Sequence, residues 1–178
     1  MKIKSLPNVF LWVMFLCLFS SQVFGLMIGL STEELTNSSE VVIKGEVEEV
    51  ESHWSADGKT IFTSALITVR DVIKGKIDQK EIIVEYEGGK VGNKVLMVSD
   101  VSPLKKGEKI ILFLTPGKSK KSEQNGDVYN IVGRAQGKYI LGDDGIARKS
   151  GFSLVDGKDI IDSNISVDNL INKIKGIK

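Results

Sequence analysis

Short apolar runs with the alternation of a β-strand fill much of the chain after residue 40, and turn sequences separate them. Residues 41–50, VVIKGEVEEV, place Val41, Ile43 and Val47 on one face and charged side chains on the other. Residues 55–60, SADGKT, contain an Asp-Gly pair that favours a tight turn, and residues 61–73 resume the apolar pattern. The sequence therefore predicts a long β-hairpin.

Further strands follow at close spacing. Residues 81–86, EIIVEY, have β-branched residues at their centre, and residues 110–114, IILFL, are so uniformly apolar that they predict a strand covered on both faces. Residues 95–98 and 127–141 predict two more strands, and the Asp-Asp-Gly of residues 143–145 predicts a second hairpin. Residues 115–127 are polar and predict an exposed connection.

Helices are expected only near the two ends. Ser31 and Glu34 have capping-box spacing, which predicts a short helix to about residue 37. Ser166 precedes apolar side chains at helical spacing, namely Val167, Leu170, Ile171 and Ile174. The pattern predicts a mainly β fold, a small OB-like β-barrel with a short N-terminal helix and a C-terminal amphipathic helix. A β-sandwich stays the alternative, because periodicity does not separate the two.

The first residues have the features of a secretory signal. Lys2 and Lys4 give a basic start, and residues 9–19 are apolar and uncharged. Gly25 is a suitable last residue before cleavage, with a cut after Ser21 as the alternative. We expect a signal peptide at residues 1–25, a single domain at residues 26–178, and a secreted or periplasmic protein. An uncleaved anchor is the rival hypothesis, although the apolar run is shorter than the roughly 20 residues of a membrane span.

The mature chain is expected to lack cysteine and to be nearly neutral. Cys17 is the single cysteine, and Leu16 before it does not fit lipid attachment. Its removal excludes a disulfide, a thiol nucleophile and a thiolate metal site. The chain has 24 basic and 23 acidic residues, and removal of Lys2 and Lys4 with the signal leaves 22 basic ones. The expected mature charge is thus near −1, so neither nucleic acid nor an anionic membrane is favoured as a partner.

A glycine-rich loop, YEGGKVGNK at residues 86–94, invites comparison with phosphate-binding loops. Such a loop needs backbone amides that converge at a helix N-terminus, whereas Gly88, Gly89 and Gly92 lead into the strand pattern VLMV. The spacing also fits neither nucleotide-binding motif. The loop is therefore interpreted as a kinked strand-to-strand connection.

Two groups of residues are candidate binding sites. His53 and Trp54 lie at the tip of the first predicted hairpin, where an exposed aromatic pair suits a binding contact. His53 is the single histidine, and no spacing around it supports a catalytic triad or a zinc site. Arg134, Gln136 and Lys138 would share one face of a strand and form an anion- or peptide-recognising surface, with a solvated outer face as the simpler alternative.

The order of these segments resembles a group of exported, mostly bacterial proteins for which no activity is established. The resemblance covers VIKGEV, DVIKGK, GEKIILFL and YNIVGRAQGKY in that order, followed by the capped helix. More distantly, the segments resemble the OB-type barrel of netrin modules and tissue inhibitors of metalloproteinases. That resemblance implies a barrel, but those inhibitors chelate metal through an N-terminal Cys, which is absent from this mature chain.

These observations favour an exported, non-catalytic domain that binds a protein, a peptide or an envelope component. No cofactor or metal is expected, and the sequence leaves the oligomeric state open. Two alternatives remain: a protease inhibitor acting through residues 55–60 or 115–127, and a hydrolase with a carboxylate site assembled from distant residues.

Overall fold

A computed structural model describes residues 28–119, 128–152 and 161–177. The predicted signal peptide and its cleavage point lie outside these residues, as does part of the connection predicted at residues 115–127. The elements are α2 (Thr32–Ser38), β1 (Val41–Trp54), β2 (Ile61–Lys74), β3 (Glu81–Glu87), β4 (Gly89–Val91), β5 (Lys94–Leu96), β6 (Lys109–Gly117), β7 (Val128–Ile131), the 3-10 helix η1 (Arg134–Gly137), β8 (Lys138–Leu141), β9 (Ile146–Arg148), β10 (Asn164–Ser166) and α3 (Val167–Gly176).

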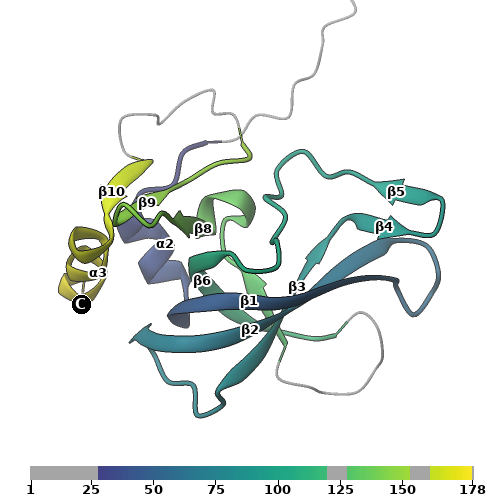
Figure 1. Ribbon diagram of the computed structural model, residues 1–178, viewed down its shortest axis with the longest axis horizontal. Helices are drawn as coiled ribbons and strands as arrows, with labels where there is room; N and C mark the ends of the chain where they lie inside the picture. Colours follow the sequence, from purple (N-terminus) through teal and green to yellow (C-terminus); the bar gives the residue numbers. More distant parts are fainter. Residues whose placement is uncertain (1–27, 120–127, 153–160, 178) are drawn as a thin grey trace, which may run out of the picture.

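The fold is mainly β, with the two expected helices near its ends (Figure 1). β1 and β2 form the predicted long hairpin, and β1 also pairs with β6 along its first half. The order β1-β2-β3-β7-β6 thus returns to β1, and the β3–β7 pairing is parallel whereas the other pairings of this series are antiparallel. β8, β9 and β10 extend the sheet from β6.

β6 lies between two apolar cores, as its uniformly apolar sequence predicts. Ile110, Leu112 and Leu114 pack with side chains of β1, β2 and β3, whereas Ile111 and Phe113 pack with α2, α3 and β8. All five side chains are fully buried. A strand with apolar residues on both faces suits this position because it is covered on both sides.

Gly45 marks a close approach between β1 and β2. A Cβ atom at this position would lie 2.8 Å from both Cγ2 of Ile67 and the carbonyl oxygen of Thr68. Val41, Ile43 and Val47 are buried on the same side, as predicted. The absence of a side chain at residue 45 therefore permits the tight packing of this hairpin.

The glycine-rich loop forms a small hairpin of β4 and β5, in agreement with the structural interpretation. Gly88, Gly89 and Gly92 have φ angles of 104°, 131° and 56°, which suit glycine. The apolar run that follows departs from the prediction of a longer strand, because β5 ends at Leu96 and Met97 is 89% exposed. The two strands form a separate sheet, which leaves these apolar side chains without a covering layer.

The single strand predicted for residues 127–141 is wrong. β7 ends at Ile131, and η1 separates it from β8. Gly133 and Arg134 both have left-handed backbone conformations, with φ angles of 65° and 54°, so the chain turns instead of continuing as a strand. The two strands that result pair with different parts of β6.

Both terminal helices begin at the predicted caps. Ser31 and Glu34 form the expected capping box at α2, and the Ser166 side chain accepts a hydrogen bond from the backbone N–H of Asn169 at α3. Leu35 of α2 and Leu170 of α3 are fully buried in the core outside β6. The helices therefore cover the outer face of the sheet beside β6 (Figure 1).

Candidate functional site

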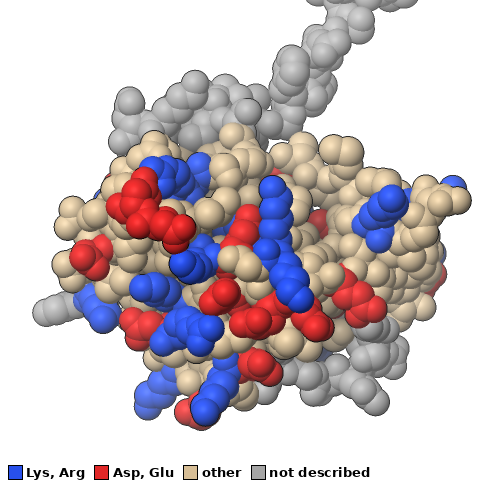
Figure 2. All heavy atoms as spheres, in the orientation of Figure 1, with Lys and Arg blue, Asp and Glu red and all other residues tan. Residues whose placement is uncertain are grey.

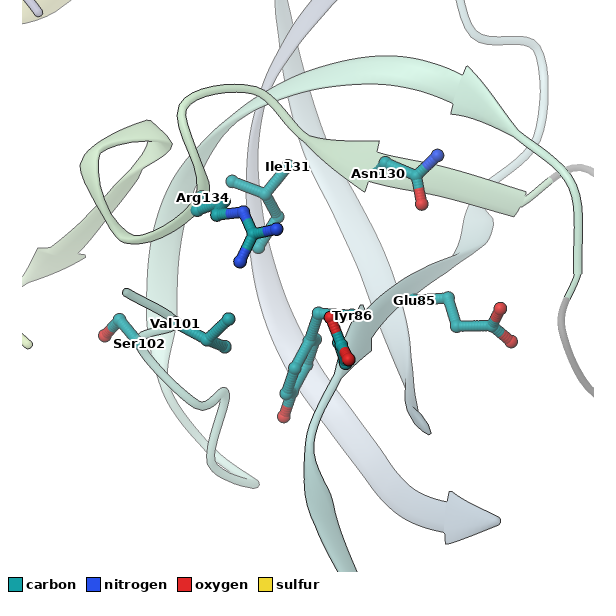
Figure 3. Close-up of a pocket in the computed structure, with 8 residues that line it drawn as sticks. Glu85, Tyr86, Val101, Ser102, Asn130, Ile131 and Arg134 are labelled. Atoms are coloured by element: carbon teal, nitrogen blue, oxygen red, sulfur yellow. The ribbon is translucent and has the colours of Figure 1, made fainter. Parts of the chain in front are cut away.

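Arg134 lies in the wall of a cleft between β3, β7 and the connection from β5 to β6. This Arg134 cleft has a volume of about 240 Å³. Figure 3 shows the Arg134 guanidinium directed into the space between Tyr86 and Val101. The cleft is lined by Glu85, Tyr86, Glu87, Val101, Ser102, Asn130, Ile131 and Arg134.

Backbone geometry and an ion pair hold Arg134 in place. Its Nη1 donates a hydrogen bond of 2.7 Å to Oδ1 of Asp100, and the Asp100 carbonyl accepts a bond of 3.0 Å from the N–H of Ala135. The left-handed conformation of Arg134 costs about 1–3 kcal/mol for a side chain other than glycine. Strain of this kind is concentrated at functional sites.

The Arg134 side chain is 53% exposed, so it remains accessible to a ligand. The hydrogen bond to Asp100 uses one of the five N–H donors of the guanidinium. Asn130 and Ser102 add neutral polar groups to the wall, and Glu87 adds a carboxylate. The cleft can therefore accept a ligand that carries a carboxylate beside a basic group.

Gln136 and Lys138 do not share an exposed face with Arg134, so the predicted polar row is wrong in its geometry. Gln136 is 3% exposed; its Nε2 donates to the carbonyl of Ile28 and its Oε1 accepts from the N–H of Leu30. These bonds attach the segment before α2 to η1. The change from strand to η1 places this amide inside the molecule.

Lys138 is also buried, with 2% of its side chain exposed. Its ammonium group donates to the carbonyl of Pro103 and to Oε2 of Glu108, at 2.7 and 2.8 Å. Burial lowers the pKa of Lys138, and the Glu108 carboxylate opposes that effect. Lys138 therefore ties β8 to the turn before β6.

Only one residue of the predicted aromatic pair at the first hairpin is exposed. Trp54 is 41% exposed, whereas His53 is 8% exposed and therefore is not the surface residue expected. A register shift between Val47 and Glu49 changes which side chains face each side of β1. His53 consequently lies against Ser64 of β2 and Glu85 of β3.

Ser64, His53 and Glu85 form a cluster that sequence spacing did not reveal. The Ser64 hydroxyl lies 2.8 Å from His53 Nε2 and 3.2 Å from Glu85 Oε1, and Nε2 lies 3.4 Å from the same carboxylate oxygen. His53 Nδ1 lies 3.1 Å from the Trp54 carbonyl. The three residues come from three strands, so only the β1–β2–β3 pairing brings them together.

The cluster differs from a catalytic triad in one decisive respect. In a triad, the nucleophile contacts one ring nitrogen of histidine and the carboxylate orients the ring from the other. Here Ser64 and Glu85 both approach Nε2, and a backbone carbonyl occupies the Nδ1 side. The carboxylate therefore has no position from which to orient the imidazole as a base for Ser64.

An apolar groove adjoins the Arg134 cleft and was missed by sequence analysis. This hairpin groove has a volume of about 400 Å³ and lies between the β4–β5 hairpin and the β1–β2 hairpin. It shares Tyr86, Glu87 and Val101 with the Arg134 cleft. The available signal was the apolar run after the glycine loop, which the structure leaves on the surface.

Lys149 and Tyr139 belong to a second group of buried polar side chains, apart from the Lys138–Glu108 ion pair. The Lys149 ammonium group is buried without a hydrogen-bond partner among the described residues and lies 4.6 Å from the centroid of the Tyr139 ring. Burial lowers the pKa of Lys149 to about 8. The Tyr139 hydroxyl lies 3.2 Å from Oγ1 of Thr32, which in turn donates to Asp162, and burial raises the pKa of Tyr139.

Residues 55–60, the first loop of the inhibitor hypothesis, offer little extended backbone. Residues 55–60 form a tight turn, in which Ser55 N–H donates to the Thr60 carbonyl and Gly58 N–H donates to the Ser55 carbonyl, both at 2.8 Å. Residues 120–127 of the second loop lie outside the described part of the chain. A turn closed in this way differs from a loop that would enter a protease cleft.

In residues 28–119, 128–152 and 161–177, no group of three or more His, Cys, Asp or Glu residues could hold a metal ion. Of the helices that the structure describes, none has both the length and the apolar character to cross a bilayer. No protein-family model matches the chain, and no curated protein matches it.

Proposed function

We propose that this chain is an extracytoplasmic, non-catalytic domain that recognises a peptide or a peptide-like envelope component through the Arg134 cleft. The observation that carries the proposal is the half-exposed Arg134 side chain, held over the cleft by Asp100 and by a left-handed backbone. An arginine so positioned is suited to a carboxylate, because a guanidinium forms paired hydrogen bonds with its two oxygens.

The fold that presents this cleft is proposed to be an OB-type barrel. Its support is the ring of pairings β1-β2-β3-β7-β6, in which β6 pairs with β1 and the parallel contact joins β3 and β7, the third and fifth of these strands in chain order. Such a ring removes exposed strand edges. It also gives the cleft rigid walls, since Tyr86 is on β3 and Asn130 is on β7.

The ligand is proposed to carry a carboxylate next to a basic group. Arg134 attracts the carboxylate, while Glu87 in the same wall would repel a second one and favour an amine or a basic side chain. An acidic side chain beside Lys or Arg in a peptide satisfies both. Asn130 and Ser102 can bond to the peptide backbone or to neighbouring polar groups.

Binding without catalysis is supported by the Ser64–His53–Glu85 cluster. Its hydroxyl and carboxylate meet the same nitrogen, as described above. His53 and Glu85 are 8% and 3% exposed, so the cluster serves to join three strands. The extracytoplasmic location rests on the signal-like sequence of residues 1–25.

The test is selection of displayed peptides on the purified protein, followed by affinity measurement by fluorescence anisotropy. Arg134→Ala is expected to weaken the selected peptides by at least about tenfold, because a charge-assisted pair contributes about 1.5–3 kcal/mol. Arg70→Ala is the matched control, since Arg70 is similarly exposed at 57% and bonds to Glu46 away from the cleft. Equal affinities of the wild type and Arg134→Ala would refute the proposal.

A further inference from the structure

The hairpin groove contains few polar groups that a ligand could use. Ser52 Oγ and Thr63 Oγ1 lie 2.9 Å apart, Thr63 donates to the Gly88 carbonyl, and the N–H of Lys90 donates to Ser52. The Tyr86 hydroxyl accepts a hydrogen bond of 3.1 Å from the N–H of Leu104. Because these groups bond to one another, the groove offers an apolar ligand a surface with little desolvation cost.

Apolar side chains form the wall and the rim of the groove. Val50, Val95 and Met97 line it and are 38%, 60% and 89% exposed. Half-buried Val98 and buried Leu104 also line it. Exposed apolar side chains gathered beside a concavity indicate a binding surface, and methionine adapts readily to different apolar ligands.

The charge of the hairpin is positive. Lys90 lines the groove and lies directly opposite Val95 in the β4–β5 pairing, and Lys94 follows at the start of β5. Residues 88–99 contain these two lysines and no acidic residue. Figure 2 shows this part of the surface as mostly uncharged atoms, with blue Lys or Arg atoms at its edge. Glu87, the last residue of β3, also lines the groove, so an anion is favoured at the Lys90 end.

We propose that the hairpin groove binds the acyl chain of an anionic amphiphile, with the chain along the apolar wall and the head group at Lys90. The volume of about 400 Å³ is within the range of about 300–1,000 Å³ that small-molecule sites occupy. An acyl chain requires no hydrogen bonds from the wall, which distinguishes it from a peptide backbone. The groove adjoins the Arg134 cleft, but Lys90 and Met97 line only the groove, so the proposal does not depend on the proposed peptide function.

Dodecanoate below its micellar concentration is the probe, and isothermal titration calorimetry of the purified protein measures its affinity. We expect saturable binding of one molecule, and Met97→Asp is expected to weaken it at least about tenfold through loss of apolar contact and charge repulsion. Ile83→Asp is the matched control, because Ile83 is an exposed apolar residue of β3, at 40%, that does not line the groove. The affinity of Ile83→Asp should equal that of the wild type.

A neutral amphiphile separates the contribution of Lys90 from that of the chain. Lys90→Glu is expected to weaken dodecanoate about tenfold while leaving dodecyl maltoside nearly unchanged. Arg134→Ala should leave dodecanoate binding intact, which distinguishes this site from the peptide site. Absence of saturable dodecanoate binding, or wild-type affinity in Met97→Asp, would overturn the proposal. Binding to anionic vesicles without binding to monomeric dodecanoate would also overturn it and would assign the hairpin to a bilayer surface.

Discussion

Replacement of Lys149 by methionine is expected to reduce the change in the free energy of unfolding between pH 7 and pH 9.5. The Lys149 ammonium group is buried without a hydrogen-bond partner among the described residues, above the Tyr139 ring. Burial lowers the pKa of Lys149 from 10.5 to about 8, so the folded chain releases this proton before the unfolded chain does. Between these two pH values the unfolded state binds more protons, and the free energy of unfolding therefore rises with pH.

The size of this rise follows from the difference between the two pKa values. At 1.36 kcal/mol per pH unit, the full difference corresponds to roughly 3 kcal/mol, of which roughly 2 kcal/mol is gained between pH 7 and pH 9.5. Below pH 8 the buried charge is retained and destabilises the folded state. Lys149→Met removes that charge while keeping an unbranched apolar side chain, so it should stabilise the protein at pH 7. Loss of the cation–π contact offsets this gain by about 1 kcal/mol.

Urea unfolding at pH 7 and pH 9.5, for the wild type and Lys149→Met, measures the effect. Other groups titrate in both proteins, so the informative quantity is the difference between the two pH dependences. Lys59→Met is the matched control, because the Lys59 side chain is 81% exposed. Parallel changes of the unfolding free energy in the wild type and Lys149→Met would refute the inference that this amine is buried and poorly solvated.

Two further substitutions test packing around the predicted sites. Gln136→Ala leaves the N–H of Leu30 and the carbonyl of Ile28 without their side-chain partner. The free energy of unfolding in urea should therefore fall by roughly 2–4 kcal/mol, and the segment before α2 should become sensitive to proteolysis. An unchanged urea midpoint would contradict the internal role of Gln136. Gly45→Val places a β-branched side chain against Ile67 at the β1–β2 contact. We expect the free energy of unfolding to fall by roughly 3 kcal/mol, or the protein to fail to fold. Wild-type stability of this variant would show that the hairpin is less tightly packed.

Local sequence signals predicted the elements whose partners were close in the chain or whose burial was complete. The β1–β2 hairpin followed from an Asp-Gly turn between alternating runs, and β6 followed from five consecutive apolar residues. The caps at Ser31 and Ser166 located both helices, because side-chain capping is a local interaction. The turn and the caps depend on contacts within a few residues, whereas the five apolar residues of β6 indicated burial without indicating its partners.

The geometry of the candidate sites was not predicted, because it depends on contacts between strands that are far apart in the sequence. Hydrophobic periodicity does not reveal such contacts. His53 is buried because Ser64 and Glu85 lie on neighbouring strands, and a register shift in β1 directs it toward them. The alternation of small and polar residues from Gly133 to Lys138 resembles a strand, yet the left-handed conformation at Gly133 breaks it. Arg134 was predicted as a site residue for its chemistry, whereas its place in the cleft comes from this turn.

The central proposal is that the strands form a closed ring, which would position both the Arg134 cleft and the hairpin groove. Amide hydrogen exchange measured by NMR tests it most directly, since a closed ring has no strand with a free edge. The account predicts slow exchange of the hydrogen-bonded amides in β1, β2, β3, β6 and β7 together, including those of the β1–β6 and β3–β7 pairings. Rapid exchange along one of these two pairings, with the other strands protected, would show an open sheet and contradict the account.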